Sequence, residues 1–359
     1  MSLLTSPNPP KQMLLDGLIL PSKYILGPAI KILLLFTTAF CPTCRIVYAS
    51  IYTLPLCNYN SKISIFDCVH ASLEVIILSL VILMVLFGFN LDYFKKFIST
   101  MELLSIEFNS TTVASIKRNR RRNTIILFIP FISNVIVCMV YMESEIQNVD
   151  IFKVILIVIN QVCLISGLFF FLNMTCNICI CLHATFNEIN AQIAALNETD
   201  NQLFYSFHEI RTLRKKYSYA VRSTQNAEKL FRYFITIFYV EYFSLNIMNI
   251  VRSFEPETKI GPIWLASILI QTAQLLILTY NLVSVNNISR HGLEDLYEFS
   301  FKLDTIHLYH ENDIFIARMA LSDVGFTFAN LFTINNSFIT SMFTLSLTII
   351  IALASFIYH

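Results

Sequence analysis

The chain has 359 residues, of which 55% are apolar and only 14% are charged, and its mean hydropathy is +0.63. A soluble domain of this size cannot bury so much apolar surface, so the composition excludes an ordinary soluble protein and indicates an all-α membrane protein. The net charge of +1 gives no reason to expect a nucleic-acid partner.

Seven windows are apolar enough to cross a bilayer, which takes about 20 helical residues. The first is the weakest, since Lys31, Pro42 and Arg45 lie inside it. The last is too long for a simple crossing, so we expect it to begin with a cytoplasmic extension. Because Asp16 interrupts the early apolar stretch, we expect no cleavable signal peptide, and the first span would act as the insertion signal. In chain order the windows are 25–50, 65–89, 123–142, 152–180, 231–251, 261–285 and 323–357.

Basic residues are concentrated in the loops that follow the second, fourth and sixth windows. These loops contain Lys95, Lys96, Lys117, Arg118, Arg120, Arg121, Arg122, Arg211, Arg214, Lys215, Lys216, Arg222, Lys229, Arg290, Lys302 and Arg318. The intervening loops hold only Lys62, Arg252 and Lys259. Short basic loops remain in the cytoplasm, so the pattern predicts a cytoplasmic amino terminus and an extracellular carboxyl terminus. A G-protein-coupled receptor has the opposite orientation, which disfavours that class.

Apolar residues at helical spacing also occupy the cytoplasmic segments. Residues 184–196 show this spacing, which breaks at 197–201 and resumes over 204–230. Residues 293–320 are also predicted to be helical, with Leu293, Leu296, Phe299 and Leu303 on one stripe. We therefore expect long cytoplasmic helical extensions of spans four to seven. Either ordinary amphipathic loops or a packed intracellular bundle would explain them.

The carboxyl-terminal helix shows a partial motif. Thr348-Ile349 is followed by five apolar residues and then by Ser355-Phe356. With this motif, the inverted seven-span topology and the long last helix, the chain resembles the insect gustatory receptor family, whose last helix has Thr-Tyr, five apolar residues and Gln-Phe. The approach Gly325–Ile334, which contains a Leu-Phe pair, is also similar. Ile349 and Ser355 depart from the family pattern and indicate a divergent member.

The resemblance implies a ligand-gated, non-selective cation channel in the plasma membrane of chemosensory neurons. Such receptors assemble as homo- or heterotetramers with related subunits, and the last span lines the pore. The domain organisation would then be 1–285 for spans one to six with an outer ligand pocket, 286–322 for a cytoplasmic anchor helix, and 323–359 for the pore-lining span. Ile350 replaces the Glu of the sugar-receptor branch, which favours a bitter-type plant tastant.

Three other functions stay open. Insect odorant receptors share the fold, and an odorant receptor subunit would need a co-receptor. A small-molecule transporter is disfavoured because no pair of broken spans is placed symmetrically in two halves. A non-conducting scaffold would use only the cytoplasmic bundle.

Hydroxyl side chains form a stripe along the last span. A wet pore wall would explain them, because hydroxyls replace part of an ion's hydration, but so would bonds to the helix's own backbone. With the family resemblance we favour the pore, and Phe356 is the candidate for a hydrophobic constriction. The pore and gate candidates are Ser337, Thr340, Ser341, Thr344, Thr348, Ser355 and Phe356.

Polar and aromatic residues in the other spans are the candidate ligand site, because such groups are costly in lipid and should face a cavity or a neighbouring helix. Glu241 is the most informative, since a carboxylate there needs a partner or water. The candidates are His70, Glu74, Asn134, Tyr141, Asn160, Gln161, Glu241, Tyr242, Asn246, Trp264, Gln271 and Gln274.

Cysteines and motifs point to no enzyme, cofactor or metal. Cys176, Cys179 and Cys181 have no His or further Cys nearby to complete a zinc site, and palmitoylation is the alternative for them. A disulfide between Cys57 and Cys68, which flank the first outer loop, is left open. The chain has no phosphate-binding loop, zinc-hydrolase motif or nucleophile elbow, so we expect no catalytic activity and no cofactor.

Overall fold

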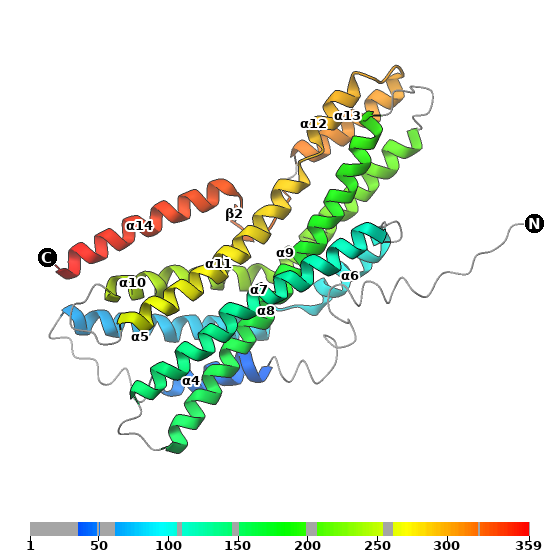
Figure 1. Cartoon of the computed structure of the whole chain (residues 1–359). Helices are drawn as coiled ribbons and strands as arrows, with labels where there is room; N and C mark the ends of the chain where they lie inside the picture. Colours follow the sequence, from blue (N-terminus) through cyan, green and yellow to red (C-terminus); the bar gives the residue numbers. More distant parts are fainter. Residues whose placement is uncertain are drawn as a thin grey trace, which may run out of the picture.

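A computed structural model describes residues 35–48, 50, 62–105, 110–145, 151–198, 207–253, 261–321 and 324–358. Helices form nearly all of this part, and one two-stranded hairpin interrupts them (Figure 1). The elements in order are η1 (Phe36–Phe40), α4 (Cys41–Tyr48), α5 (Lys62–Leu83), η4 (Met84–Gly88), α6 (Leu91–Ser105), α7 (Ser110–Glu145), α8 (Ile151–Glu198), α9 (Phe207–Glu241), η7 (Tyr242–Asn246), α10 (Ile247–Ser253), α11 (Gly261–Ser289), α12 (Leu293–Ser300), α13 (Ile306–Leu321), β1 (Thr327–Phe328), β2 (Phe332–Thr333) and α14 (Asn336–Tyr358). Those labelled η are π-helical.

Every predicted window falls on helix where the structure describes it, except for Phe89 at the end of the second window and the beginning of the last. Among the described residues, four stretches are both long and apolar enough to cross a membrane: Cys68–Gly88, Val158–Glu198, Leu265–Ser300 and Asn336–Leu353. These stretches confirm a helical protein suited to a membrane. The count of seven spans and the orientation of the termini stay predictions.

The fourth and fifth windows continue into helices much longer than a bilayer requires. The 48 residues of α8 extend for about 72 Å at 1.5 Å per residue, whereas the hydrocarbon core is about 30 Å thick. Of the helical break predicted at 197–201, the first two residues are still helical, since α8 ends at Glu198, and residues 199–201 lie outside the described part of the chain.

The prediction of a continuous helical extension into the last span is wrong. Segment 293–320 forms two helices, α12 and α13, because Asp304 and Thr305, which favour helix starts over helix interiors, precede Ile306. A hairpin then separates α13 from α14, with Thr327 paired to Thr333 and Phe328 to Phe332. Its turn places Ala329 and Asn330 at positive φ, which no helix accommodates.

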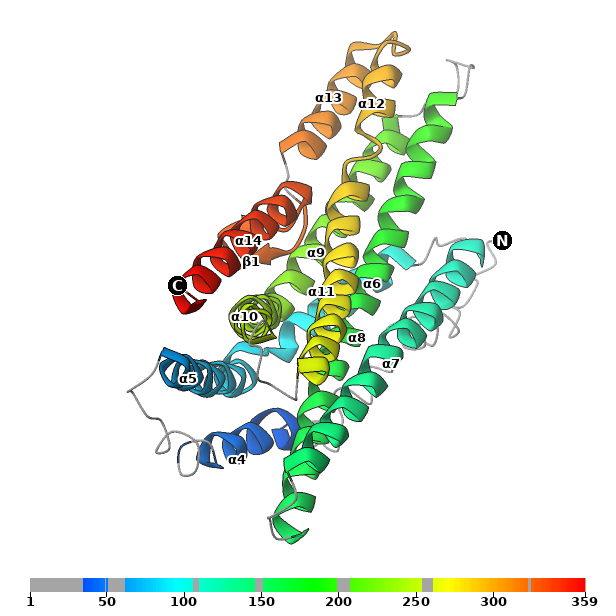
Figure 2. The same cartoon turned by 60° about the vertical axis from the view of Figure 1, so that its left-hand side comes forward.

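The bundle of α12, α13 and the far ends of α8 and α9 lies at one end of the molecule (Figure 2). Arg214 on α9 pairs with Glu311 on α13 at 2.6 Å. Asn190 on α8 donates a hydrogen bond to the carbonyl of Ile288 at 2.8 Å. These contacts between elements favour the packed bundle over independent amphipathic loops.

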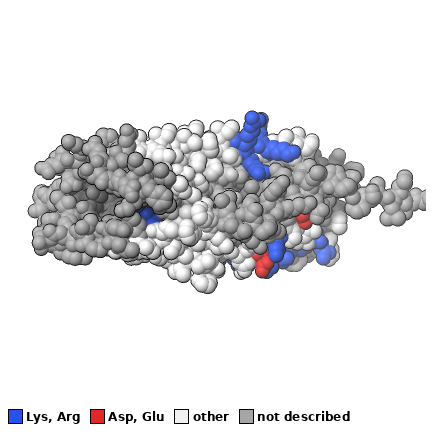
Figure 3. All heavy atoms as spheres, turned by 90° about the horizontal axis from the view of Figure 1, so that it is seen from below, with Lys and Arg blue, Asp and Glu red and all other residues white. Residues whose placement is uncertain are grey.

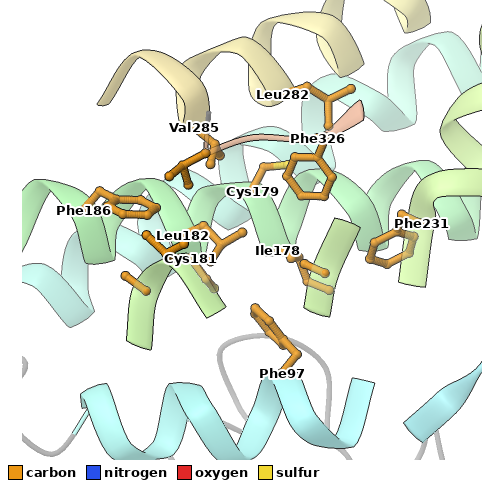
Figure 4. Packing of buried hydrophobic residues seen from close by; sticks show 14 of the residues in the cluster. Phe97, Ile178, Cys179, Cys181, Leu182, Phe186, Phe231, Leu282, Val285 and Phe326 are labelled. Carbon is orange, nitrogen blue, oxygen red and sulfur yellow. The ribbon is translucent and has the colours of Figure 1, made fainter. Parts of the chain in front are cut away.

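The core is centred on α8. Figure 4 shows side chains from α6, α9 and α11 converging on its Ile178, Cys179 and Leu182, with Phe326 reaching in from the segment before β1. Cys176, Cys179 and Cys181 are at most 2% exposed, so they act as small apolar core residues and are closed to palmitoylation. No metal-binding cluster occurs among the described residues.

Helix α6 was not predicted. Its buried apolar residues are Phe94, Phe97, Ile98, Met101 and Leu104, and their spacing is that of an amphipathic helix. This apolar period can be read in the sequence, although the loop that contains it was interpreted only by its basic residues.

The surface supports a membrane setting. Many large apolar side chains of α5, η4, α7, α11 and α14 are exposed, including Phe87, Ile129, Leu269 and Phe343. On the face drawn in Figure 3, most of the visible Lys and Arg gather in one half, beside a belt without charged side chains. Such an apolar surface needs lipid or partner protein to cover it.

Candidate functional site

A cavity of about 340 Å³ lies between the helices. Its wall is mainly apolar, with polar groups placed among aliphatic and aromatic side chains, as in sites for small organic molecules. The lining residues are Thr37, Thr38, Arg45, His70, Glu74, Ile77, Leu78, Val81, Met84, Asn134, Val137, Gln161, Leu164, Ile165, Leu168, Phe171, Phe234, Ile237, Phe238, Glu241, Leu245, Asn249, Ser267 and Gln271.

Three π-helical segments border this cavity. Thr37 and Thr38 come from η1, Met84 from η4 and Leu245 from η7. A π-helical turn adds a residue to the helical period, turning side chains away from their regular positions, and such turns concentrate at functional sites. Regular α-helices would aim these side chains differently, so the cavity depends on the three interruptions.

Charged groups occupy one part of the cavity wall. The Arg45 guanidinium on α4 donates a hydrogen bond to Glu74 Oε1 on α5 at 3.0 Å. In the part of the chain that the structure describes, the Glu241 carboxylate has no ion-pair partner, and Asn249 Oδ1 is buried without a hydrogen bond. The described wall therefore holds two carboxylates and one guanidinium, leaving one carboxylate in excess.

Half of the twelve predicted ligand residues line the cavity: His70, Glu74, Asn134, Gln161, Glu241 and Gln271. Tyr242 lies elsewhere and shares a hydrogen bond with Thr272 at 3.0 Å. Asn246 and Gln274 are buried outside the cavity, and Asn160 is half-buried and also outside it. The side chains of Tyr141 and Trp264 are not among those described.

Reasoning from the sequence missed Arg45, Thr37 and Thr38. Arg45 weakens the first window as a membrane span, but a charge inside an apolar window is itself a signal of a buried partner. That partner, Glu74, was predicted for the site. The two threonines gave no signal, because a hydroxyl in a membrane helix usually bonds to its own backbone.

Helix α9 connects the cavity with the hairpin that leads into α14. Phe234, Ile237, Phe238 and Glu241 of α9 line the cavity. One to two turns earlier, Glu228 accepts two hydrogen bonds from Arg232, both at 2.7 Å, and one from the hydroxyl of Thr327 at 2.5 Å. Thr236 accepts a hydrogen bond from the backbone N–H of Ala329 at 2.9 Å. Displacement of α9 by a bound molecule would therefore move the hairpin.

The hairpin is joined to α14 by aromatic rings. Phe338 at the start of α14 packs against Phe328 of β1 and Tyr239 of α9, with ring centroids 5.8 and 5.6 Å apart. Tyr239 in turn shares a hydrogen bond with Thr279 of α11 at 2.6 Å. The beginning of α14 is thus fixed to the same helix that borders the cavity.

The predicted hydroxyl stripe lies on the side of α14 opposite Met342 and Ser346. Ser337, Thr340, Ser341, Thr344, Thr348 and Ser355 are all exposed, whereas Phe338 is buried and Met342 and Ser346 are half-buried. The hydroxyls of Thr340, Thr344 and Thr348 donate to the carbonyl four residues earlier, at 3.2, 3.0 and 2.9 Å. The Phe356 side chain is not among those described.

Comparison with known proteins identifies the fold. No family model and no curated protein matches the sequence. The structure of the insect olfactory receptor OR5 from Machilis hrabei in complex with eugenol matches with a TM-score of 0.60 and 14% identity, over 96% of this chain and 97% of that chain. This chain has the fold of an insect olfactory receptor. A second structure of the same receptor matches with a TM-score of 0.51 and 15% identity, over 96% of both chains.

The insect olfactory receptor fold covers nearly the whole chain, so spans, bundle and last helix belong to one architecture. The likeness confirms the helical membrane architecture expected from the sequence. At 14% identity it shows the fold alone, and it does not separate gustatory from olfactory receptors.

Proposed function

We propose that the chain is a gustatory receptor: a non-selective cation channel of chemosensory neurons, opened by a small tastant. Four subunits, identical or related, would surround a pore lined by α14. The observation that carries the proposal is the cavity between the helices, bordered by a helix that also holds the hairpin leading into α14. The OR5 receptor, whose fold this chain has, was solved in complex with the small molecule eugenol.

The charges of the cavity favour a tastant that carries a basic amine. Arg45 is already engaged by Glu74, and Glu241 faces the cavity without a cationic partner among the described residues. A buried carboxylate is stabilised by a cation or a hydrogen-bond donor. A protonated amine supplies both, and the aromatic rings of Phe171, Phe234 and Phe238 offer faces to it. Basic plant compounds fit the bitter-type tastant that the sequence favours.

The backbone bonds of the α14 threonines suit a cation pathway. A threonine hydroxyl has one donor and two acceptor lone pairs. Because Thr340, Thr344 and Thr348 give their protons to the helix backbone, the atoms they present outward are acceptors. Acceptor oxygens replace the hydration of cations, not of anions. Hydroxyl bonds to the helix's own backbone are therefore compatible with a wet pore wall.

Opening would follow from a change in the position of α9. A ligand that fits the cavity only when α9 shifts would bias the hairpin and the start of α14, because Glu228, Thr236 and Tyr239 hold all three together. The ligand shifts the equilibrium by its difference in affinity for the two arrangements.

The fold gives a second candidate, an odorant receptor subunit that conducts only with a co-receptor. The experiment therefore has two arms: the full chain expressed alone, and the chain expressed with an odorant co-receptor. Currents are recorded while amine-containing and neutral plant compounds are applied. Current in the first arm supports the gustatory proposal, and current only in the second supports the odorant alternative. No current in either arm, with the protein at the cell surface, would refute the channel.

Two variants test the site and the pore in whichever arm conducts. Glu241→Gln should reduce the potency of amine ligands by about 10- to 100-fold, because a charge-assisted hydrogen bond contributes about 1.5–3 kcal/mol, with little effect on neutral ligands. Glu294→Gln, an exposed carboxylate on α12, is the control.

Phe356→Ala should raise the current without ligand if its ring closes the pore, whereas Phe343→Ala, exposed and off the hydroxyl stripe, should not. Equal effects of the paired variants would contradict these assignments.

A further inference from the structure

Four basic residues lie on one face of α7. Lys117, Arg118, Arg121 and Arg122 are spaced i, i+1, i+4 and i+5, which places them within two adjacent rows along the helix. All four side chains are exposed. Between them, Arg120 and Asn119 turn toward the protein and are only half-exposed. In the sequence these charges indicate only which side of the membrane the loop lies on. The proposed cavity and pore do not involve them.

Among the described residues, this basic face has no acidic counterpart. In the part of the chain that the structure describes, none of the four forms an ion pair. Residues 110–122 contain no Asp or Glu. Elsewhere arginines are paired, as Arg214 is with Glu311 and Arg232 with Glu228. The charge on α7 is thus available to a partner outside the chain.

The same face of the same helix becomes fully apolar within one turn. Ile125, Phe128, Ile129 and Ile136 follow on it, with 55%, 49%, 63% and 56% of their surface exposed. Ile125 is three positions after Arg122, which is a rise of about 4.5 Å along the helix. An exposed isoleucine and phenylalanine face on a membrane helix is covered by lipid chains. The four basic side chains therefore lie at the depth of the lipid headgroups.

We propose that this face of α7 binds anionic phospholipid headgroups of the cytoplasmic leaflet. Lys and Arg side chains have apolar stems and charged ends, so they can lie along the bilayer while their charges reach the phosphates. Basic clusters directly beside a membrane span attract acidic lipids with about 1 kcal/mol per residue near the surface. An acidic protein segment would match the charge but not the continuous apolar face below it, which is why lipid is the occupant.

The test measures lipid binding by the purified full-length protein in an uncharged detergent. Phosphatidylserine is titrated in mixed micelles, with phosphatidylcholine as the uncharged comparison. Arg121→Gln/Arg122→Gln should weaken phosphatidylserine binding by about 30-fold, since two charges are removed. The charge-conserving pair Arg121→Lys/Arg122→Lys should bind within about threefold of the wild type. Added salt should weaken the wild type more than the Gln variant.

A matched control keeps the test specific. Arg211→Gln/Lys215→Gln removes two exposed charges from α9, where exposed polar residues, Arg222 and Gln225, follow instead of an apolar face. This variant should bind as the wild type does. If Arg121→Gln/Arg122→Gln does not fold, as judged by its thermal unfolding, Lys117→Gln/Arg118→Gln takes its place.

Three results would overturn the proposal. The first is wild-type affinity in both variants of the α7 face, and the second is an equal loss in the α9 control. The third is tighter binding of a polyglutamate peptide than of phosphatidylserine, which would assign the face to an acidic protein. Because the readout is lipid binding, its outcome is independent of whether the protein conducts.

Discussion

Single residues set the dimensions of the cavity. Gly167 lies on α8 where the Thr37 and Thr38 side chains of η1 cross it. A Cβ at this position would stand 2.8 Å from Cγ2 of Thr38 and 3.3 Å from Oγ1 of Thr37. Both threonines line the cavity, and their branched side chains have little freedom to turn away. The missing side chain of Gly167 therefore fixes how closely η1 approaches α8.

Gly167→Ala should displace η1 and lower ligand potency by about tenfold. Overpacking costs about 1–3 kcal/mol, which exceeds the gain of up to about 1 kcal/mol from replacing a helical glycine. Thermal unfolding and ligand dose–response curves measure the two effects. Ser166→Ala is the control, because among the described residues its hydroxyl bonds only within α8, to the carbonyl of Val162 at 2.7 Å. Greater stability of Gly167→Ala than of the wild type would show that η1 is not held against α8.

At the scale of elements, the hairpin β1–β2 is the junction between the bundle that contains α12 and α13 and the last helix, α14. Hydrogen bonds hold the hairpin to α9, where Glu228 and Thr236 accept them. A further hydrogen bond holds the segment before it to α11, where Asn286 donates to the carbonyl of Val324 at 2.9 Å. Glu228 is only 6% exposed, so its carboxylate depends on Arg232 and Thr327 for its hydrogen bonds. A buried group with these partners holds its surroundings in one arrangement.

Thr327→Val should separate binding from opening. The substitution keeps the side-chain shape but removes the donor to Glu228, with an expected loss of about 1–2 kcal/mol in stability. The ligand-evoked current should fall, while ligand binding to the purified protein stays within about threefold. Thr333→Val, directly across the hairpin from Thr327, is the control, because no hydrogen bond of its hydroxyl occurs among the described residues. Identical currents in both variants would exclude the hairpin from the coupling.

At the scale of the whole molecule, orientation links the fold to the proposed function. The far end of α8 and the beginning of α9, together with α12 and α13, lie at one end of the molecule (Figure 1), and the basic residues Arg211, Arg214, Lys215 and Lys216 belong to this part of α9. A cytoplasmic bundle there would place the cavity and the carboxyl end of α14 toward the outside. The cavity could then receive a tastant directly from the extracellular fluid.

Epitope tags in live cells measure this orientation. A tag after His359 should be labelled on intact cells, because the predicted topology places the carboxyl terminus outside. A tag inserted between α8 and α9 should be labelled only after permeabilisation. The reverse result for both tags would mean an inverted protein, and the basic face of α7 would then meet the outer leaflet, which is poor in acidic lipid.

The sequence by itself determined the class of the protein. Apolar windows of sufficient length, helical periods outside them and a carboxylate within a span follow from local composition, so membrane helices and cavity residues such as Glu74 and Glu241 were predictable. Local composition has no information on how a helix is rotated against its neighbours. That is why Tyr242 and Asn246 were expected in the cavity but lie outside it.

Only the tertiary structure decided what depends on contacts between distant segments. The pairing of Arg45 with Glu74, the three π-helical turns around the cavity and the attachment of the hairpin to Glu228 each join parts far apart in the sequence. The hairpin, which replaces a continuous last helix, also depends on contacts with distant segments, since the flanking residues Phe326 and Ile334 are buried in the main core. Burial of these side chains outweighs the helical preference of the local sequence.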